Sequence, residues 1–137
     1  MNTILNINNL SVDFDTEYGI FHAVDNVSFT VSKGQVVGIV GESGCGKTVT
    51  TLAIMRLLDT VVGASIQGEI LFEGQDLLSL RKKQMHQIRG NEISMIFQEP
   101  MTSLNPILTI GRQITESLEL HLKMSSKQAK ELSLIHI

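Results

Sequence analysis

Short apolar runs alternate with glycine-rich turns along the chain, which predicts strands and helices packed in one α/β domain. Ile4–Phe14 is strand-like. Val27, Phe29 and Val31 alternate with small polar residues, the period-two pattern of a half-buried strand. The run Val36–Val40 is short, apolar and rich in β-branched residues. It is therefore expected to form a strand buried on both faces of a parallel sheet.

Helical and extended patterns continue after this run. Lys47–Leu58 predicts a helix with a broad apolar face. Gly63–Ser65 is expected to be a loop, and Glu69–Phe72 a strand. Leu80–Arg89 predicts a polar helix that ends at a Gly-Asn pair, and Ile93–Phe97 predicts another apolar strand.

Two helices are predicted near the end of the chain. Apolar residues recur at a spacing of four from Ile110 to Leu122, and Thr109 is a candidate N-cap. Ser125 and Gln128 have the spacing of a capping box that opens a further helix.

Composition narrows the class of protein. The chain has 137 residues with 42% hydrophobic and 4% aromatic residues, so its core must be aliphatic. A net charge of -3 argues against a nucleic-acid partner held through phosphate contacts. Cys45 is the single cysteine, which excludes an internal disulfide and is compatible with a reducing cytosol. No signal peptide and no run of about 18 apolar residues is present, so work at a membrane would require docking onto other subunits.

One motif carries specific chemistry. The stretch GESGCGKT fits the pattern G-x-x-x-x-G-K-[ST], and it consists of Gly41, Glu42, Ser43, Gly44, Cys45, Gly46, Lys47 and Thr48. Its glycines let the backbone turn several N–H groups inward as an anion nest, and the following helix adds a partial positive charge. Lys47 supplies a mobile charge for the β- and γ-phosphates of a nucleotide, and Thr48 a hydroxyl for Mg²⁺.

The motif is specific, although a plain strand–turn–helix corner is the alternative. Four fixed positions match by chance at about 3 × 10⁻⁵ per start, or below about 1% over a chain of this length. The expected context is present as well, with an apolar run before the loop and a helical pattern after it. Cys45 occupies a variable position, where a small residue suits a tight turn and no redox role is required.

A second segment indicates which nucleotide-binding family is involved. Residues 93–106 read ISMIFQEPMTSLNP, which resembles the Q-loop region of ABC ATPases. Together with AVDNVSFTV and GIVGESGCGKTVTTLAIMRLL, this segment closely resembles the oligopeptide, dipeptide and nickel importer branch, from about Leu5 to Leu132. The resemblance implies a P-loop NTPase with a RecA-like ABC ATPase core and an N-terminal antiparallel β subdomain. It also implies an ATP-hydrolysing subunit that energises peptide import, with nickel import as the nearest rival.

The family assigns roles to individual residues. Gln98 matches the Q-loop glutamine that reaches Mg²⁺ and the attacking water, so Thr48 and Gln98 are the expected metal contacts and Lys47 the expected catalytic cation. A neutral amide suits such a role, because its oxygen can contact a metal and its nitrogen a water. Thr50 is included among the nucleotide-binding residues. Without the flanking motif, Gln98 would be read as a polar residue that caps a strand.

The aromatic residue expected to stack on adenine is ambiguous. Counting forward from Asn9-Leu10 leads to Phe14, whereas counting back from Phe29 leads to Tyr18. Phe14 is the preferred candidate. Ordinary packing is the alternative role for either ring.

The resemblance also implies partners and a location. ATP and Mg²⁺ are the expected cofactors. The expected partners are integral membrane permease subunits, a second ABC ATPase subunit and, indirectly, an extracytoplasmic binding protein, all at the cytoplasmic face of the inner membrane. The Arg81-Lys82-Lys83 cluster is interpreted as a solvated helix face, and the four histidines show no metal-ligand spacing.

The family pattern stops before its signature motif and before its Walker B strand, so the chain is expected to be an N-terminal fragment that does not turn over ATP alone. Residues 1–131 are expected to be family sequence. Residues 132–137 read as a translation of CTG TCT CTT ATA CAC ATC, which resembles a transposon-based sequencing adapter. Two other classes remain: a small P-loop kinase, which would need a lid and phosphate-clamping arginines, and a non-catalytic nucleotide-binding module that truly ends here.

Overall fold

The computed structural model describes residues 2–98 and 104–135, with side chains described up to Ser133. The chain divides into two compact units, Met1–Lys82 and Lys83–Ile137. The candidate phosphate-binding loop belongs to the first unit and Gln98 to the second.

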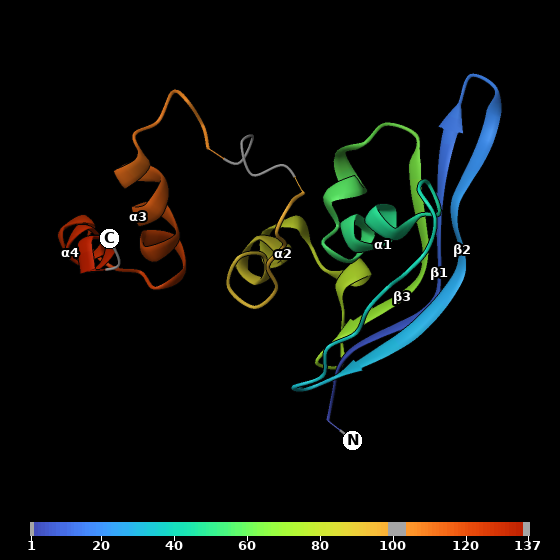
Figure 1. Ribbon diagram of the computed structural model, residues 1–137, viewed down its shortest axis with the longest axis horizontal. Helices are drawn as coiled ribbons and strands as arrows, with labels where there is room; N and C mark the ends of the chain where they lie inside the picture. The colour runs from blue at the N-terminus through green and yellow to red at the C-terminus, as the bar shows by residue number, and fades with distance from the viewer. Residues whose placement is uncertain (1, 99–103, 136–137) are drawn as a thin grey trace. The chain divides into compact units, whose positions relative to one another are not determined.

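An antiparallel sheet forms most of the first unit (Figure 1). Its strands are β1 (Thr3–Thr16), β2 (Gly19–Ser32), β3 (Ala64–Phe72) and β4 (Gln75–Asp76), in the order β2-β1-β3-β4. β1 is the central strand and pairs antiparallel with both β2 and β3. This confirms the predicted antiparallel β subdomain. The expected loop at residues 63–65 is correct only for residue 63, because β3 begins at Ala64.

One face of the sheet carries the core of this unit. α1 (Lys47–Ile54) contacts β1 and β2, and is followed by two short 3₁₀ helices, η1 (Leu57–Thr60) and η2 (Leu77–Ser79). The predicted helix over residues 47–58 is interrupted because Arg56 adopts a left-handed conformation with φ of 52°. The buried apolar side chains include Ile7, Leu10, Val12, Val24, Ala53, Ile54, Leu58, Ile70, Phe72 and Leu77.

The β1–β2 ladder is irregular beside α1. Val12 pairs with Val24, whereas the next residue, Asp13, pairs with His22, so Ala23 is an extra residue on β2. This two-against-one arrangement is a β-bulge, which bends the strand and re-aims the side chains on either side of it.

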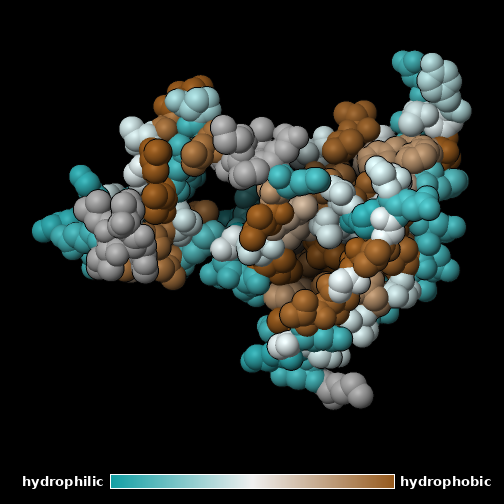
Figure 2. Space-filling model, in the orientation of Figure 1, coloured by the Kyte–Doolittle hydropathy of each residue, from teal (hydrophilic) through white to brown (hydrophobic). Residues whose placement is uncertain are grey.

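The run from Val36 to Val40 is not a strand, and the prediction of a strand buried on both faces is wrong. Residues 35–40 have no regular secondary structure. Val36 and Val40 are 97% and 96% exposed. A strand is stabilised by its hydrogen-bonded neighbours, and no strand of the described chain pairs with this run. Its apolar composition therefore does not by itself create an extended, buried element. Figure 2 shows hydrophobic residues on the visible face of the first unit.

The second unit is helical in its described parts. It contains α2 (Lys82–Ile88), which begins at the unit boundary, α3 (Ile110–His121) and α4 (Ser126–Ile135). The predicted strand Ile93–Phe97 is wrong, because only a single bridge between Arg89 and Ile93 forms there and the neighbours needed for a ladder are absent from the described residues.

The predicted caps of the last two helices are confirmed. Thr109 Oγ1 accepts a hydrogen bond of 3.3 Å from the N–H of Arg112, at the start of α3. Ser125 Oγ accepts from the N–H of Gln128 at 3.4 Å, while Gln128 Oε1 accepts from the N–H of Ser125 at 3.1 Å. Across residues 2–98 and 104–135, none of the helices has the length and apolar character needed to span a bilayer.

Candidate functional site

Two glycines shape the loop at residues 41–48. Gly44 and Gly46 have φ of 82° and 84°, a region that side chains with a Cβ rarely adopt. Gly46 is also the N-cap of α1. A Cβ at this position would clash with the carbonyl oxygen of Ala23 and lie 3.2 Å from Val24 Cγ2. Only glycine therefore allows α1 to begin so close to β2.

Lys47 folds back over the loop that precedes it. Its Nζ donates a hydrogen bond of 2.8 Å to the carbonyl oxygen of Gly41 and another to that of Glu42. It also lies 3.3 Å from Cys45 Sγ. The ammonium group is thus held on the loop by neutral acceptors. An anion would form stronger, charge-assisted hydrogen bonds with it.

The first turn of α1 carries no acidic side chain, and Gly46 provides no side-chain cap. The first N–H groups of a helix lack partners within the helix and carry a partial positive charge. This helix end can therefore donate to an anion placed in the loop.

The two threonines named from the sequence differ in their surroundings. Thr48 is exposed, so its hydroxyl is accessible to a ligand. Thr50 is buried, and its Oγ1 donates a hydrogen bond of 2.9 Å to the carbonyl oxygen of Gly46. Thr50 therefore supports the junction between the loop and α1.

The residues present fit a phosphate group. A positive ammonium, an uncapped helix N-terminus and left-handed glycines converge on one loop.

For a metal, the described residues contain no group of three or more His, Cys, Asp and Glu side chains that could hold one. Mg²⁺ commonly binds through one or two protein groups and the phosphates of its substrate. An exposed Thr48 hydroxyl fits that mode.

Gln98 lies at a bend in the second unit, and its side chain is exposed. Residues 99–103 of the resembling segment lie outside the described residues. Its role toward Mg²⁺ and water stays a prediction.

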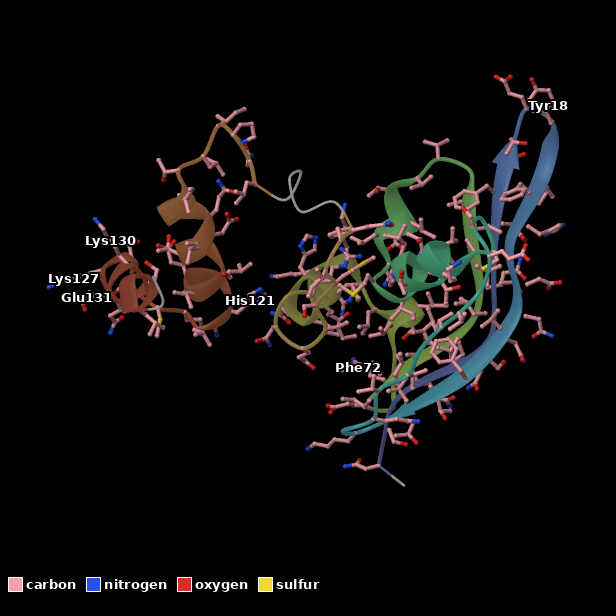
Figure 3. All side chains as sticks on the ribbon, viewed as in Figure 1. Tyr18, Phe72, His121, Lys127, Lys130 and Glu131 are labelled. Atoms are coloured by element: carbon pink, nitrogen blue, oxygen red, sulfur yellow. The ribbon has the colours of Figure 1, made fainter. Side chains whose placement is uncertain are left out.

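The two aromatic candidates for the base occupy different places on the hairpin. Tyr18 lies at the tip of the β1–β2 hairpin and is 99% exposed (Figure 3). Phe14 is half-buried within β1 and pairs across the ladder with Phe21. Phe21 did not emerge from the sequence. Its signal was hidden because the extra residue Ala23 interrupts the period-two pattern of β2.

The loop at residues 41–48, the helix α1 that follows it and the antiparallel sheet beside it form a structure whose residues fit a phosphate group, as in the P-loop class. A family model described as "ABC transporter" matches residues 24–136. The chain belongs to this ABC transporter family.

Two curated relatives are 50% identical to this chain over the aligned residues. The oligopeptide transport ATP-binding protein AppD of Bacillus subtilis is 50% identical over 131 residues, covering 96% of this chain and 40% of AppD. The dipeptide transport ATP-binding protein DppD of the same organism is 50% identical, covering 96% of this chain and 39% of DppD. The chain thus spans about two fifths of the length of the curated relatives it matches.

A solved structure shares the fold. The dimeric structure of MJ0796, a bacterial ABC transporter cassette, aligns with a TM-score of 0.78 and 24% identity, covering 95% of this chain and 54% of that chain. The chain therefore has the fold of part of an ABC ATPase cassette, as predicted from the sequence.

Proposed function

We propose that this chain is the part of an ABC importer's ATP-binding subunit that holds the nucleotide phosphates, and that the whole protein hydrolyses ATP to drive peptide uptake. The observation that carries the proposal is the loop at residues 41–48, where Lys47 Nζ rests 2.8 Å from the Gly41 carbonyl beside an uncapped helix N-terminus. The peptide-transport names of AppD and DppD support peptide over nickel as the cargo.

The residues have distinct roles in this proposal. Residues 41–46 wrap the β-phosphate with backbone N–H groups, and Lys47 exchanges its carbonyl partners for phosphate oxygens. The Thr48 hydroxyl would hold Mg²⁺, and the bound metal would supply positive charge to the phosphates of the nucleotide. Gln98 positions the attacking water and the metal. Because the signature motif and Walker B are not found in this sequence, the 137-residue chain is expected to have no turnover by itself.

The assembly follows from the same proposal. Two ATP-binding subunits pair, and they dock on membrane permease subunits at the cytoplasmic face of the membrane. An extracytoplasmic binding protein delivers the peptide.

Residues 132–137 are proposed to be adapter-derived, and resequencing of adapter-free genomic DNA tests this. A natural stop codon directly after Ile137 would contradict it.

The substitution Lys47→Ala in the full-length protein tests the central claim. ATP affinity by calorimetry is expected to fall at least about tenfold, because a charge-assisted contact of about 1.5–3 kcal/mol is removed. Steady-state turnover is expected to be lost. Lys33→Ala, at an exposed lysine beyond the end of β2, is the control and leaves both unchanged. Undiminished ATP affinity and turnover in Lys47→Ala would overturn the proposal.

A further inference from the structure

A pocket of about 420 Å³ lies within the second unit, a volume in the range of small-molecule sites. We call it the basic pocket, because four of the described side chains that line it are lysines or histidines. The chain as a whole has a net charge of -3, so composition alone does not account for this grouping. The polar lining of the basic pocket consists of Lys83, His86, Gln87, Asn91, His121 and Lys123.

α2 forms one wall of the basic pocket. Lys83, His86 and Gln87 follow the spacing i, i+3, i+4, which places their side chains on one face of the helix. Met85 and Ile88 occupy another face of α2 and are only 1% and 6% exposed. The apolar face therefore anchors the helix, and the wall that faces the pocket is polar and basic.

The end of α3 forms the opposite wall. His121 is the last residue of α3 and is half-buried (Figure 3). A Cβ on Gly90 would lie 3.0 Å from His121 Nε2, so the turn after α2 contacts this ring. Lys123 has φ of 53°, and the N–H of Met124 donates a hydrogen bond of 3.4 Å to the carbonyl oxygen of Leu118. This sharp reversal of the chain leaves Lys123 beside the ring on the same pocket.

The four basic side chains have no acidic partner among the residues that the structure describes. None of the described lining residues is acidic. Glu119 is close in sequence to His121, but Arg112 binds its carboxylate at 2.8 Å. Glu92 follows Asn91 directly and does not line the pocket. Positive charge therefore gathers here without a counter-charge from the described protein.

Helix dipoles explain only part of this grouping. His86 and His121 lie in the last turns of α2 and α3, where a positive charge is favoured. Lys83 lies in the first turn of α2, where a positive charge is disfavoured, and no acidic residue accompanies it there. An anion bound in the basic pocket would offset this unfavourable placement.

Charge and hydrogen-bonding capacity indicate the class of ligand. Each lysine contributes a compact positive charge at neutral pH and is a common partner of phosphate. A phosphate monoester carries a charge of about -1.5 to -2 at pH 7, which matches two lysines, whereas a single carboxylate does not. The amides of Gln87 and Asn91 both donate and accept hydrogen bonds, as the hydroxyl groups of a sugar or polyol require.

We infer that the basic pocket is a binding site for a phosphate monoester, with the phosphate between the two lysines and the rest of the ligand beside the two amides. The two histidines add positive charge as the pH falls, because the charge of this side chain ordinarily changes between about pH 5 and 8. The site contains none of the residues of the loop at 41–48 and does not rest on the proposed function. It gives Lys83 a role beyond the solvated helix face expected from the sequence.

The test titrates the full-length protein with inorganic phosphate and follows the histidine ring signals by NMR. The signals of His86 and His121 report on the basic pocket, and that of His22, on β2, is the internal reference. All titrations use the Lys47→Ala background, so that the loop at 41–48 contributes little phosphate binding. Phosphate should shift the two pocket signals in a saturable way and leave the reference signal unchanged.

Paired lysine variants measure the contribution of charge. Lys83→Gln combined with Lys123→Gln should weaken phosphate binding by at least about fivefold, because two charged contacts are lost. Lys127→Gln combined with Lys130→Gln is the matched control on α4, at exposed lysines outside the basic pocket, and should change it by less than about twofold (Figure 3). Arginine at both pocket positions should retain binding, which separates loss of charge from a folding defect.

Sulfate isolates the contribution of the histidines, because it remains a dianion throughout the pH range used. Among the described lining residues, only His86 and His121 are of a type that changes charge in this range. Sulfate should therefore bind at least about threefold more tightly near pH 6 than near pH 8.

Vesicles distinguish a lipid headgroup from a soluble ligand. Phosphatidylcholine vesicles are compared with and without phosphatidic acid, whose headgroup is a phosphate monoester. Retention only on the vesicles with phosphatidic acid, lost in the pocket lysine pair, would assign the site to a lipid; phosphate binding without such retention would assign it to a soluble ligand. The inference is overturned if neither probe acts on the pocket histidines, if the control pair loses as much affinity as the pocket pair, or if sulfate binds equally at both pH values.

Discussion

Gly46 begins α1 so close to β2 that a Cβ on it would clash with the carbonyl oxygen of Ala23. The same backbone approach fixes where the loop at residues 41–48 lies relative to the sheet. Ala23 is the extra residue of the β2 bulge. The bulge and the loop therefore meet at this one backbone contact. A side chain introduced at Gly46 is expected to disturb both of them.

We predict that Gly46→Ala separates steric conflict from simple backbone strain. Gly34→Ala is the matched control, since Gly34 also has positive φ, 76°, but nothing lies within 4 Å of its Cβ position. The control should cost about 1–2 kcal/mol of unfolding free energy, the usual cost of a left-handed residue. Gly46→Ala should cost more and also reduce ATP affinity. Urea unfolding and calorimetry of the full-length protein measure both, and equal effects at the two sites would contradict the proposed contact.

Thr50→Val tests whether the junction between loop and helix is held by a buried hydrogen bond. Thr50 Oγ1 donates to the Gly46 carbonyl at 2.9 Å and is buried, whereas Thr51 Oγ1 donates to the Thr48 carbonyl at 2.9 Å with greater exposure. Loss of the buried bond should cost about 1 kcal/mol. Thr51→Val should cost less because water replaces its partner. The urea unfolding midpoints of the two variants measure these losses of stability. A larger loss of stability in Thr51→Val than in Thr50→Val would contradict the prediction.

Glu119 should make the stability of the second unit depend on pH. A hydrogen bond from Ser126 and a second one from Arg112, whose Nη1 lies 2.8 Å from Glu119 Oε2, hold the pKa of this carboxyl below its ordinary value of 4.5. Since the folded pKa is the lower one, ionised Glu119 stabilises the fold above pH 4.5, and this stabilisation is lost as the pH falls through the folded pKa.

The pH dependence is measured by carboxyl NMR titration and by urea unfolding between pH 7 and acid. Glu119→Gln should be less stable than the parent at pH 7, and the difference should shrink below pH 4.5. Glu116→Gln removes a negative charge from an exposed position on the same helix and is the control for the loss of one carboxylate. If the difference in unfolding free energy between Glu119→Gln and the parent protein grew toward low pH, the prediction would be contradicted.

The exposed run at residues 36–40 should limit the solubility of the 137-residue chain. Val36 and Val40 are almost fully exposed and flank two further exposed residues, Val37 and Ile39. Contiguous apolar surface of this kind promotes association. Replacing both valines by glutamate should raise the soluble fraction in sedimentation assays.

A charge-matched pair provides the control for this change. Tyr18 and Val62 are 99% and 97% exposed but are not part of that run. Their double substitution by glutamate should give a smaller gain. A sharp, cooperative melt of the unmodified chain without aggregation would contradict the prediction.

Local chemistry explains which parts could be predicted. Caps at Thr109 and Ser125 depend on residues three positions away, and the loop at 41–48 depends on glycines and a lysine adjacent in sequence. The antiparallel subdomain followed from period-two patterns and its family resemblance. The predicted strands at Val36–Val40 and Ile93–Phe97 were wrong. An apolar run indicates that a segment favours burial, but a strand also requires a hydrogen-bonded partner strand, and none pairs with these runs in the described residues.

The sequence by itself determined the family and the helix caps, and it predicts the phosphate-binding role of the loop at residues 41–48, because each depends on residues close together along the chain. Only the tertiary structure decided that Gly46 abuts Ala23, that the hydroxyl of Thr50 holds the Gly46 carbonyl, and that the bulge on β2 aligns Phe21 with Phe14. The physical reason is that strand register is set by pairing between distant segments, and a single extra residue moves every side chain beyond it to the other face.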